Sequence, residues 1–331
     1  ICVQMSPDSA RASTILGSPH CAAAQMAGSS LDTSWTSTPR SKSRSTVEIS
    51  PAAHASTNAA LDVRTSDGWT PAHLTAGKGH VEALRILIKQ HADINARHAN
   101  GCTPLYLACE SGQLQIVTVL LEHKADRHAS QFHGYTPVHV AAEHGHQDIV
   151  LALMGAKADI NASNKDGFSP LHAATRLGHS AIVRLLAQAG AVVNTRPCGM
   201  TALHDACEKG RLEIVQTLLD FRADTEATSD DGWTPTAIAC FHGQADVLRC
   251  LAQHNADLGV VHSSGLTSIF IASQHGHLEA VRVLIEHRAS VNAIMENGFT
   301  AAYAAAEKGH TDIVRVLGEH KADLNITTSD G

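Results

Sequence analysis

Aromatic residues are scarce in this chain of 331 residues, at 4%, although 44% of the residues are hydrophobic. A core of this composition has to be built from Leu, Ile, Val and Ala. No stretch reaches the roughly 18 apolar residues of a membrane-spanning helix. No short apolar run follows a basic start, as a signal peptide would require. The sequence therefore predicts an intracellular protein without membrane insertion, in the cytoplasm or, as an open alternative, the nucleus.

Blocks of basic residues are also missing. The formal net charge is −7, and no cluster of Lys and Arg could neutralise a nucleic-acid backbone, so we expect no nucleic-acid partner. The eight cysteines are spread thinly over the chain. Cys109, Cys207 and Cys240 recur at one position that alanine fills elsewhere. Small buried thiols in this pattern indicate a reducing compartment rather than a disulfide framework.

Glycine, in contrast, recurs at a regular spacing. The intervals between nine successive glycines are 33, 33, 33, 32, 33, 33, 33 and 33 residues. An internal period of this length is typical of a repeat protein. The nine glycines are Gly68, Gly101, Gly134, Gly167, Gly199, Gly232, Gly265, Gly298 and Gly331.

The residues around each glycine repeat as well. Gly68 leads into Trp69-Thr70-Pro71-Ala72-His73, and Gly167 leads into Phe168-Ser169-Pro170-Leu171-His172. A Thr or Ser before Pro is a good N-cap for a helix, since Pro at the first helical position gives up an amide that has no partner there. This first helix is expected to end at a glycine such as Gly79. A second helix with core spacing follows, as in Ile116, Val117 and Leu120.

This pattern resembles the ankyrin repeat, which combines a 33-residue period with a Thr-Pro-Leu-His signature. The resemblance covers residues 59–331. It implies an all-α repeat solenoid, in which helix-turn-helix units stack and β-hairpin loops project from the stack. Eight complete repeats and the start of a ninth are present, which gives an expected sixteen helices. One repeat cannot bury its own apolar face, so neighbouring repeats supply the core.

The two ends of the chain differ from the repeats. Residues 1–58 are rich in Ser, Thr and Pro, and we predict that they are disordered. A degenerate extra repeat is the alternative, because Trp35 and Val47 have the spacing of Trp69 and Val81. The last repeat lacks the polar face of a capping repeat, so we expect a truncated product. A natural end with a frayed last helix is the other reading.

Histidine is abundant, with 23 residues, and most of it falls into repeat columns. One residue per repeat indicates a structural role. The pair His144 and His146 has a spacing found in metal sites, but it is formed by two such columns side by side, and nothing completes a ligand set. No nucleophile, base and orienting group are gathered outside the columns. We therefore expect no enzyme active site, no metal site and no cofactor.

The position directly after each repeat glycine, here called the loop-base column, is the candidate for function. It holds five of the twelve aromatic residues of the chain. By resemblance to ankyrin domains, it lies on the concave side that faces a partner. Partly exposed large side chains are the usual hot spots of interfaces. The alternative is that each ring only stiffens its own loop. The predicted partner-binding residues are Trp69, Tyr135, Phe168, Met200, Trp233, Leu266 and Phe299.

The sequence predicts a protein-interaction module, an adaptor or scaffold that acts as a monomer. It would bind a protein or peptide partner along the concave face. Charges on the first helices are mixed, as at Glu110, Glu143 and Lys209, and so do not single out one type of partner. Two alternatives stay open. The array is the targeting region of a larger enzyme or channel, such as a kinase, ubiquitin ligase or ion channel, or it is a structural spacer.

Overall fold

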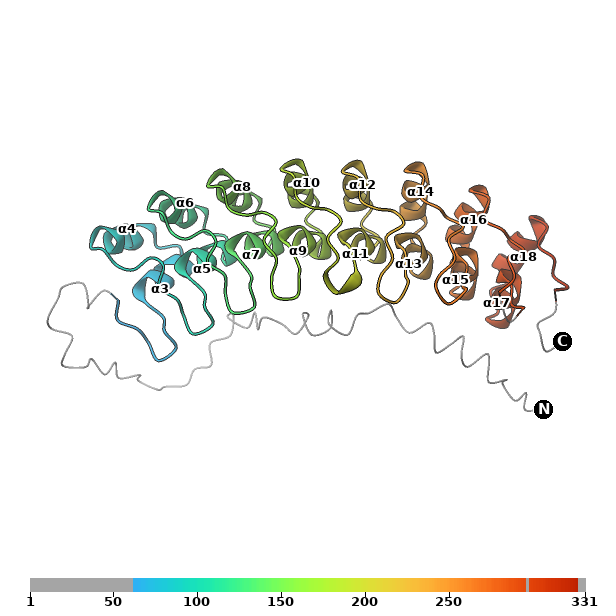
Figure 1. The fold of residues 1–331 in the computed structure, drawn as a ribbon, viewed down its shortest axis with the longest axis horizontal. Coiled ribbons are helices and arrows are strands. Elements are labelled where there is room, and N and C mark those ends of the chain that lie inside the picture. Colours follow the sequence, from blue (N-terminus) through green and yellow to red (C-terminus); the bar gives the residue numbers. More distant parts are fainter. Residues whose placement is uncertain (1–61, 296–297, 327–331) are drawn as a thin grey trace. The chain divides into compact units, whose positions relative to one another are not determined.

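The computed structural model describes residues 62–295 and 298–326. This part of the chain contains sixteen α-helices and one short 3-10 helix, and the α-helices follow one another in pairs (Figure 1). The prediction of an all-α fold with two helices per repeat is therefore confirmed. The segment 1–58, predicted to be disordered, and the start of the ninth repeat at Asp330 lie outside the described residues.

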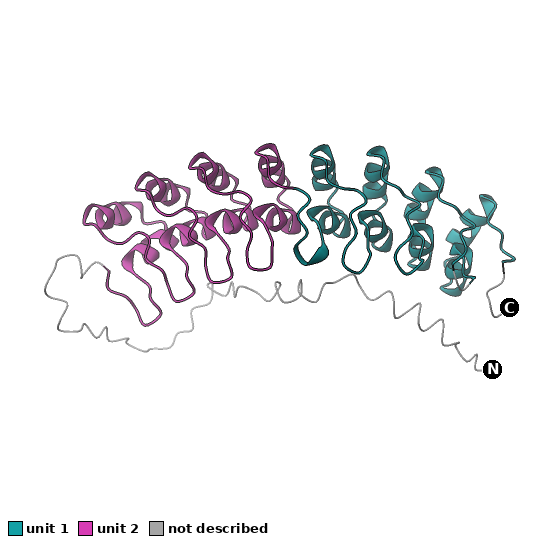
Figure 2. Cartoon of the chain, viewed as in Figure 1, with its two compact units in different colours: residues 1–32, 193–331 teal, residues 33–192 magenta. Residues whose placement is uncertain are grey.

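The chain divides into two compact units, which Figure 2 shows in different colours. Unit 2 spans residues 33–192, and unit 1 includes residues 193–331. The helices of unit 2 are α3 (Pro71–Lys78), α4 (Val81–Lys89), α5 (Pro104–Glu110), α6 (Leu114–Glu122), α7 (Pro137–Glu143), α8 (Gln147–Gly155), α9 (Pro170–Leu177) and α10 (Ser180–Gln188). Those of unit 1 are α11 (Ala202–Glu208), α12 (Leu212–Asp220), α13 (Pro235–Phe241), α14 (Ala245–Gln253), α15 (Ser268–Gln274), α16 (Leu278–Glu286), α17 (Ala301–Glu307) and α18 (Thr311–Glu319).

Within each unit the first helices of the pairs form one layer and the second helices form another (Figure 1). In unit 2, α3 packs on α5, α5 on α7 and α7 on α9, while α4, α6, α8 and α10 pack in the same order. In unit 1, α11, α13, α15 and α17 follow the same scheme. Leu105, Ile116 and Leu120 are fully buried between neighbouring pairs. The core is thus shared between repeats, as expected for a solenoid.

The first helices begin at hydroxyl caps. The backbone of Thr70 is extended, and its side chain forms a capping box with His73, while Pro71 occupies the first turn. Where proline is absent, the cap alone suffices, since the Thr267 hydroxyl accepts from the amide of Phe270 at 3.3 Å. Gly79, with a φ of 76°, ends the helix in a left-handed conformation.

The second helices are each followed by a left-handed residue that is mostly basic rather than glycine. Lys124, Lys157 and Arg222 have φ values of 62°, 61° and 63°. An L-residue in this conformation costs about 1 kcal/mol or more. The positive charge lies at the negative end of the helix dipole, which offsets part of that cost.

The loops project on the side of the first helices (Figure 1). In unit 2 they are joined in series, because the amide of Phe132 donates to the carbonyl of Asn100 at 3.0 Å, and the amide of Lys165 donates to that of His133 at 3.0 Å. The pairing is too short for regular strands in the described residues, where an isolated bridge joins Val261 and Thr267. The loops are therefore tight turns fixed by their neighbours.

The repeat that is one residue short has a different loop. In the other loops a backbone hydrogen bond closes the turn, as from the amide of Gln131 to the carbonyl of Tyr135. Here Pro197–Gly199 forms a 3-10 turn instead, in which the amide of Met200 donates to the carbonyl of Pro197 at 3.1 Å. Cys198 takes a φ of 49° inside this turn. The deletion is thus absorbed by tightening the loop, and the following helix α11 begins at the expected position.

Candidate protein-binding surface

The residues of the loop-base column lie between a loop glycine and the N-cap of a first helix. The glycine before Tyr135, Gly134, has a φ of 87°, which side chains other than hydrogen disfavour. The amide of Gln131 donates to the carbonyl of Tyr135 at 3.0 Å and closes the loop. The column side chain therefore leaves a rigid turn beside the first helix.

The aromatic rings in unit 2 pack edge-on against the histidine of the same first helix. This contact limits the rotation of each ring, so that little side-chain entropy remains to be lost on binding. The centroid distances are 5.7 Å for Trp69 and His73, 5.6 Å for Tyr135 and His139, and 5.9 Å for Phe168 and His172.

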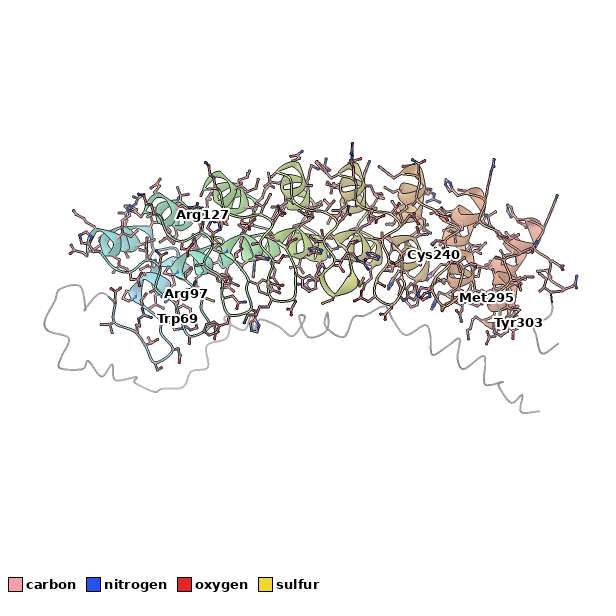
Figure 3. All side chains as sticks on the ribbon, in the orientation of Figure 1. Trp69, Arg97, Arg127, Cys240, Met295 and Tyr303 are labelled. Carbon is pink, nitrogen blue, oxygen red and sulfur yellow. The ribbon has the colours of Figure 1, made fainter. Side chains whose placement is uncertain are left out.

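Partial exposure, which a hot-spot residue needs, holds for four of the seven predicted residues: Trp69, Tyr135, Phe168 and Met200. It does not hold for the other three, Trp233, Leu266 and Phe299, which are 3%, 5% and 8% exposed. The expectation that the whole column stays partly exposed is therefore wrong in unit 1 beyond Met200. Figure 3 shows Trp69 on the loop side of unit 2.

The residue at the end of the first helix explains why Trp233 is buried while Trp69 and Phe168 are not. Phe241 lies edge-on to Trp233, with centroids 5.6 Å apart, and covers it. The guanidinium of Arg176 lies over the ring of Phe168 at 5.3 Å, and leaves it half-buried. At the equivalent position of the first repeat stands Gly77, where a Cβ would meet nothing within 4 Å. Trp69 is therefore not covered from this side.

Phe299 is covered in another way. Tyr303 stacks on it almost in parallel, with centroids 4.6 Å apart and 14° between the ring planes. Tyr303 is itself 38% exposed, so it presents the aromatic surface that sequence reasoning assigned to Phe299. The signal in the sequence is that Tyr303 stands where four other repeats have the signature histidine.

The signature histidines are structural. His139 is fully buried, and its Nδ1 accepts from the amide of Thr136 at 3.2 Å. The ring proton therefore lies on Nε2, which donates to the carbonyl of Phe168 in the next repeat at 2.9 Å. Burial lowers the pKa of His139 to about 4, and that of His204 in unit 1 also to about 4. These rings are neutral and link neighbouring repeats through hydrogen bonds.

A second column of histidines links neighbouring repeats at the start of the second helices. The Nε2 of His179 donates to the carbonyl of Glu143 at 2.8 Å, and the Nε2 of His277 donates to that of Phe241 at 2.9 Å. A Cβ on Gly145 would lie 2.7 Å from the ring of His179. The glycine thus provides both a left-handed turn and room for the imidazole of the next repeat.

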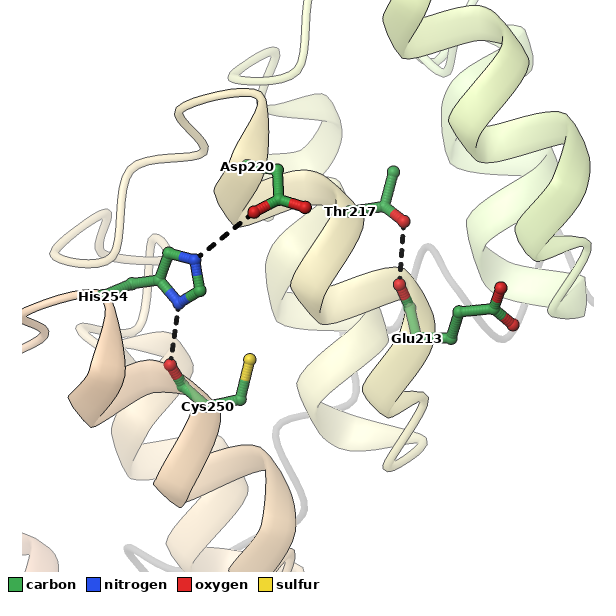
Figure 4. Close-up of polar contacts among 5 residues, drawn as sticks. All are labelled: Glu213, Thr217, Asp220, Cys250 and His254. Atoms are coloured by element: carbon green, nitrogen blue, oxygen red, sulfur yellow. Dashed lines mark hydrogen bonds and ion pairs between the residues drawn. The ribbon is translucent and has the colours of Figure 1, made fainter.

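A third column lies at the ends of the second helices, as the close-up of α12 and α14 shows (Figure 4). The Nδ1 of His254 lies 3.0 Å from the carbonyl of Cys250 in its own helix. Its Nε2 lies 3.6 Å from a carboxylate oxygen of Asp220 in the preceding repeat. Both groups are partly exposed, so this pair contributes little to stability. It caps α14 and provides a further link between repeats.

The recurring cysteines are buried in the first helices. Cys109, Cys207 and Cys240 are inaccessible to solvent, and burial raises the pKa of each thiol far above its usual value. Cys102 in the loop-base column is less buried, and its pKa is raised to about 11, chiefly by desolvation. Thiols of this kind are poor nucleophiles.

The surface at the ends of the first helices varies from repeat to repeat. In unit 2 it carries Glu110 and Glu143 in adjacent repeats. Burial, and then the charge of Glu143, raise the pKa of Glu110, while His144 opposes the shift. In unit 1, Glu208 pairs with Lys209 at 2.8 Å. The surface thus offers different charges to a partner along each unit.

Among residues 62–295 and 298–326, no three side chains of His, Cys, Asp or Glu are placed to hold a metal ion. None of the helices there has the length and apolar character needed to span a membrane. Two open depressions have volumes of about 220 and 320 Å³. The first lies between α12 and α14 and the second around Gly145 and His146.

Comparison with known proteins agrees with this geometry. The sequence model of the family described as Ankyrin repeats (3 copies) matches residues 47–131, 126–197, 192–262 and 254–328. The human ASB11 ankyrin repeat domain superposes with a TM-score of 0.60 at 24% identity, over 67% of this chain and 99% of that one. The ankyrin repeat domain of Bcl-3, described as a unique member of the IkappaB protein family, gives 0.59 at 26% identity, over 66% and 100%. No curated protein sequence matches the chain.

Proposed function

Because this chain belongs to the ankyrin-repeat family, whose domains are generally protein-interaction modules, we propose that it is an adaptor that recognises a protein or peptide partner. The partner would lie along the surface formed by the loops and the ends of the first helices. The role proposed is recognition rather than catalysis. Specificity would come from the side chains in which one repeat differs from the next.

The observation that carries this proposal is the row of half-buried rings in unit 2. Trp69, Tyr135 and Phe168 are held by their histidine contacts on loops that are themselves joined by backbone hydrogen bonds. Large rings that are already fixed bind with a low entropic cost, which is typical of hot spots. The burial of Trp233 removes it from this set, so the binding face of unit 1 has to be formed by other residues.

Site-specific photocrosslinking tests the proposal. A photoreactive phenylalanine analogue is placed at Ser111, which is exposed at the end of α5. The matched control carries it at Thr118, which is exposed on α6 in the other helix layer. We expect crosslinked partner from Ser111 and much less from Thr118. Equal crosslinking from both positions would contradict the assignment of the face, and no crosslink from either would contradict the adaptor function. Mass spectrometry then identifies the partner.

A targeting role within a larger enzyme or channel makes a different prediction for the same experiment. The crosslinked species would then be a substrate or a membrane protein rather than another adaptor. A purely structural spacer would give no crosslink from the first-helix positions. The binding surface proposed here is the same in the adaptor and the targeting case.

A further inference from the structure

Unit 1 carries a cluster of rings at the ends of two neighbouring first helices. We call it the imidazole cluster and define it as Phe241, His242, His275 and His277. The centroid of Phe241 lies 4.4 Å from that of His275 and 5.0 Å from that of His242. The rings of His275 and His277 are stacked at 6.1 Å with 18° between their planes. Trp233 supports Phe241 from below at 5.6 Å.

The titratable groups that lower the pKa of His275, beside burial itself, are all basic. The groups that act on His275 are His242 after α13, His277 before α16, His310 before α18 and Lys308 after α17, all of one sign. Lys308 itself lies 3.5 Å from the carboxylate of Glu307 at the end of α17.

The residues at the ends of the first helices in unit 1 likewise leave the middle repeats without an acid. The last residue of the first helix is an acid in the outer two repeats of unit 1, at Glu208 and Glu307, and each acid is paired with the following lysine. In the two middle repeats the same position holds Phe241 and Gln274. The middle of unit 1 therefore presents imidazoles and an aromatic ring without a carboxylate of its own at these positions.

The side chains of His275 and Gln274 each have a buried polar atom without a hydrogen-bond partner in the described part of the chain. The Nε2 of His275 is buried and has no hydrogen-bond partner there, and neither has the Oε1 of Gln274, a residue that is 8% exposed. A buried polar atom left unpaired is costly, and a bound group that pairs with it removes the cost. His144, at the equivalent position in unit 2, differs because its Nδ1 lies 3.0 Å from the carbonyl of Val140.

We propose that the imidazole cluster binds an Asp or Glu carboxylate from an acidic segment of the partner. The inference rests on the proposed function and specifies the chemistry of the partner. The carboxylate accepts a hydrogen bond from the Nε2 of His275, while the aliphatic part of the acidic side chain packs on Phe241. The amide oxygen of Gln274 accepts from the backbone of the same segment.

Binding is then coupled to the uptake of a proton. In the free protein, burial and the neighbouring basic groups lower the pKa of His275. A bound carboxylate favours the imidazolium and raises that pKa again. The complex therefore holds more protons than the free chain, and the affinity increases as the pH falls from about 7.5 to about 6.

A random peptide library displayed on phage tests the proposal. The full chain is panned at about pH 6, and the recovered peptides are synthesised with a fluorescent label. We expect enrichment of Asp and Glu over the input library, and binding that is about fivefold tighter at pH 6 than at pH 7.5 by fluorescence anisotropy. Replacing the acidic residues by Asn or Gln should remove this pH dependence.

Two variants of the chain locate the effect. His275→Gln should abolish the pH dependence and weaken the acidic peptides, while His144→Gln, the matched change in unit 2, should leave both unchanged. Circular dichroism checks that both variants are folded. The proposal is overturned if no acidic enrichment is found, if affinity is equal at both pH values, or if His275→Gln binds as the parent does. If one of these results is found but a natural partner still crosslinks from Ser111, the adaptor function stands and only the binding of a carboxylate by the imidazole cluster is ruled out.

Discussion

The ring of Phe241 covers the indole of Trp233, with the two centroids 5.6 Å apart. The residues are eight positions apart in the sequence, and they connect the base of a loop to the end of the following helix. In this repeat the side chain at the end of the first helix therefore governs how much of the loop-base ring is exposed. The same relationship joins Arg176 to Phe168 at 5.3 Å.

Truncation of Phe241 should uncover Trp233. In Phe241→Ala we expect the tryptophan emission to shift to the red and acrylamide quenching to increase, because the indole, 3% exposed in the parent, gains access to water. Phe241→Ala on a Trp233→Phe background should show neither change. An unaltered emission spectrum in the single variant would contradict the covering role.

Trp233 and Trp69 should respond differently to substitution by alanine. Removing a buried Trp costs about 3–5 kcal/mol of stability, so Trp233→Ala should lower the midpoint of urea denaturation strongly. Trp69 is half-buried, so Trp69→Ala should lower that midpoint less and should instead reduce the crosslinking yield from Ser111. A larger loss of stability for Trp69→Ala than for Trp233→Ala would contradict the assignment.

Gly145 should not tolerate alanine. Its φ is 76° and a Cβ would lie 2.7 Å from the ring of His179, so Gly145→Ala combines backbone strain with a clash. We expect a loss of about 2 kcal/mol or more in the free energy of unfolding. Gly77→Ala is the matched control, because its Cβ meets nothing within 4 Å and lies in a helix, where alanine is favoured by about 1 kcal/mol. Similar midpoints of urea denaturation for the two variants would contradict this explanation of Gly145.

Acid should destabilise the chain through the signature histidines. The folded-state pKa of His139 is about 4, below the value of about 6.5 for an unfolded histidine. The unfolded state therefore binds the proton first, so stability is complete above about pH 6.5 and is lost as the pH falls towards 4. Each unit of pKa shift corresponds to about 1.4 kcal/mol.

Urea denaturation at several pH values between roughly 7 and 4.5 measures this dependence of stability on pH. The native fold still has to persist over this range. His139→Gln should be less stable at neutral pH but should show a flatter dependence on pH. The exposed His123 provides the control, and His123→Gln should keep the slope of the parent. A slope unchanged by His139→Gln would show that this residue is not responsible.

The period of the repeat, the caps and the helix boundaries could be predicted from the sequence because they depend on residues a few positions apart. The contact of Thr136 with His139 spans three residues, and the left-handed turns at Gly79 and Gly145 follow from glycine itself. Local chemistry repeated eight times leaves little room for another fold.

The exposure of the loop-base column required the tertiary structure. Trp69 and Trp233 have almost the same local sequence, and each ring packs on a histidine of the next loop at 4.6 Å. They differ in burial because Phe241 closes over one of them, while Gly77 leaves the other uncovered. Burial depends on how side chains from several segments share one volume, and a column of similar residues does not reveal this. The sequence determined the scaffold, and packing between segments decided which part of its surface remains available for a partner.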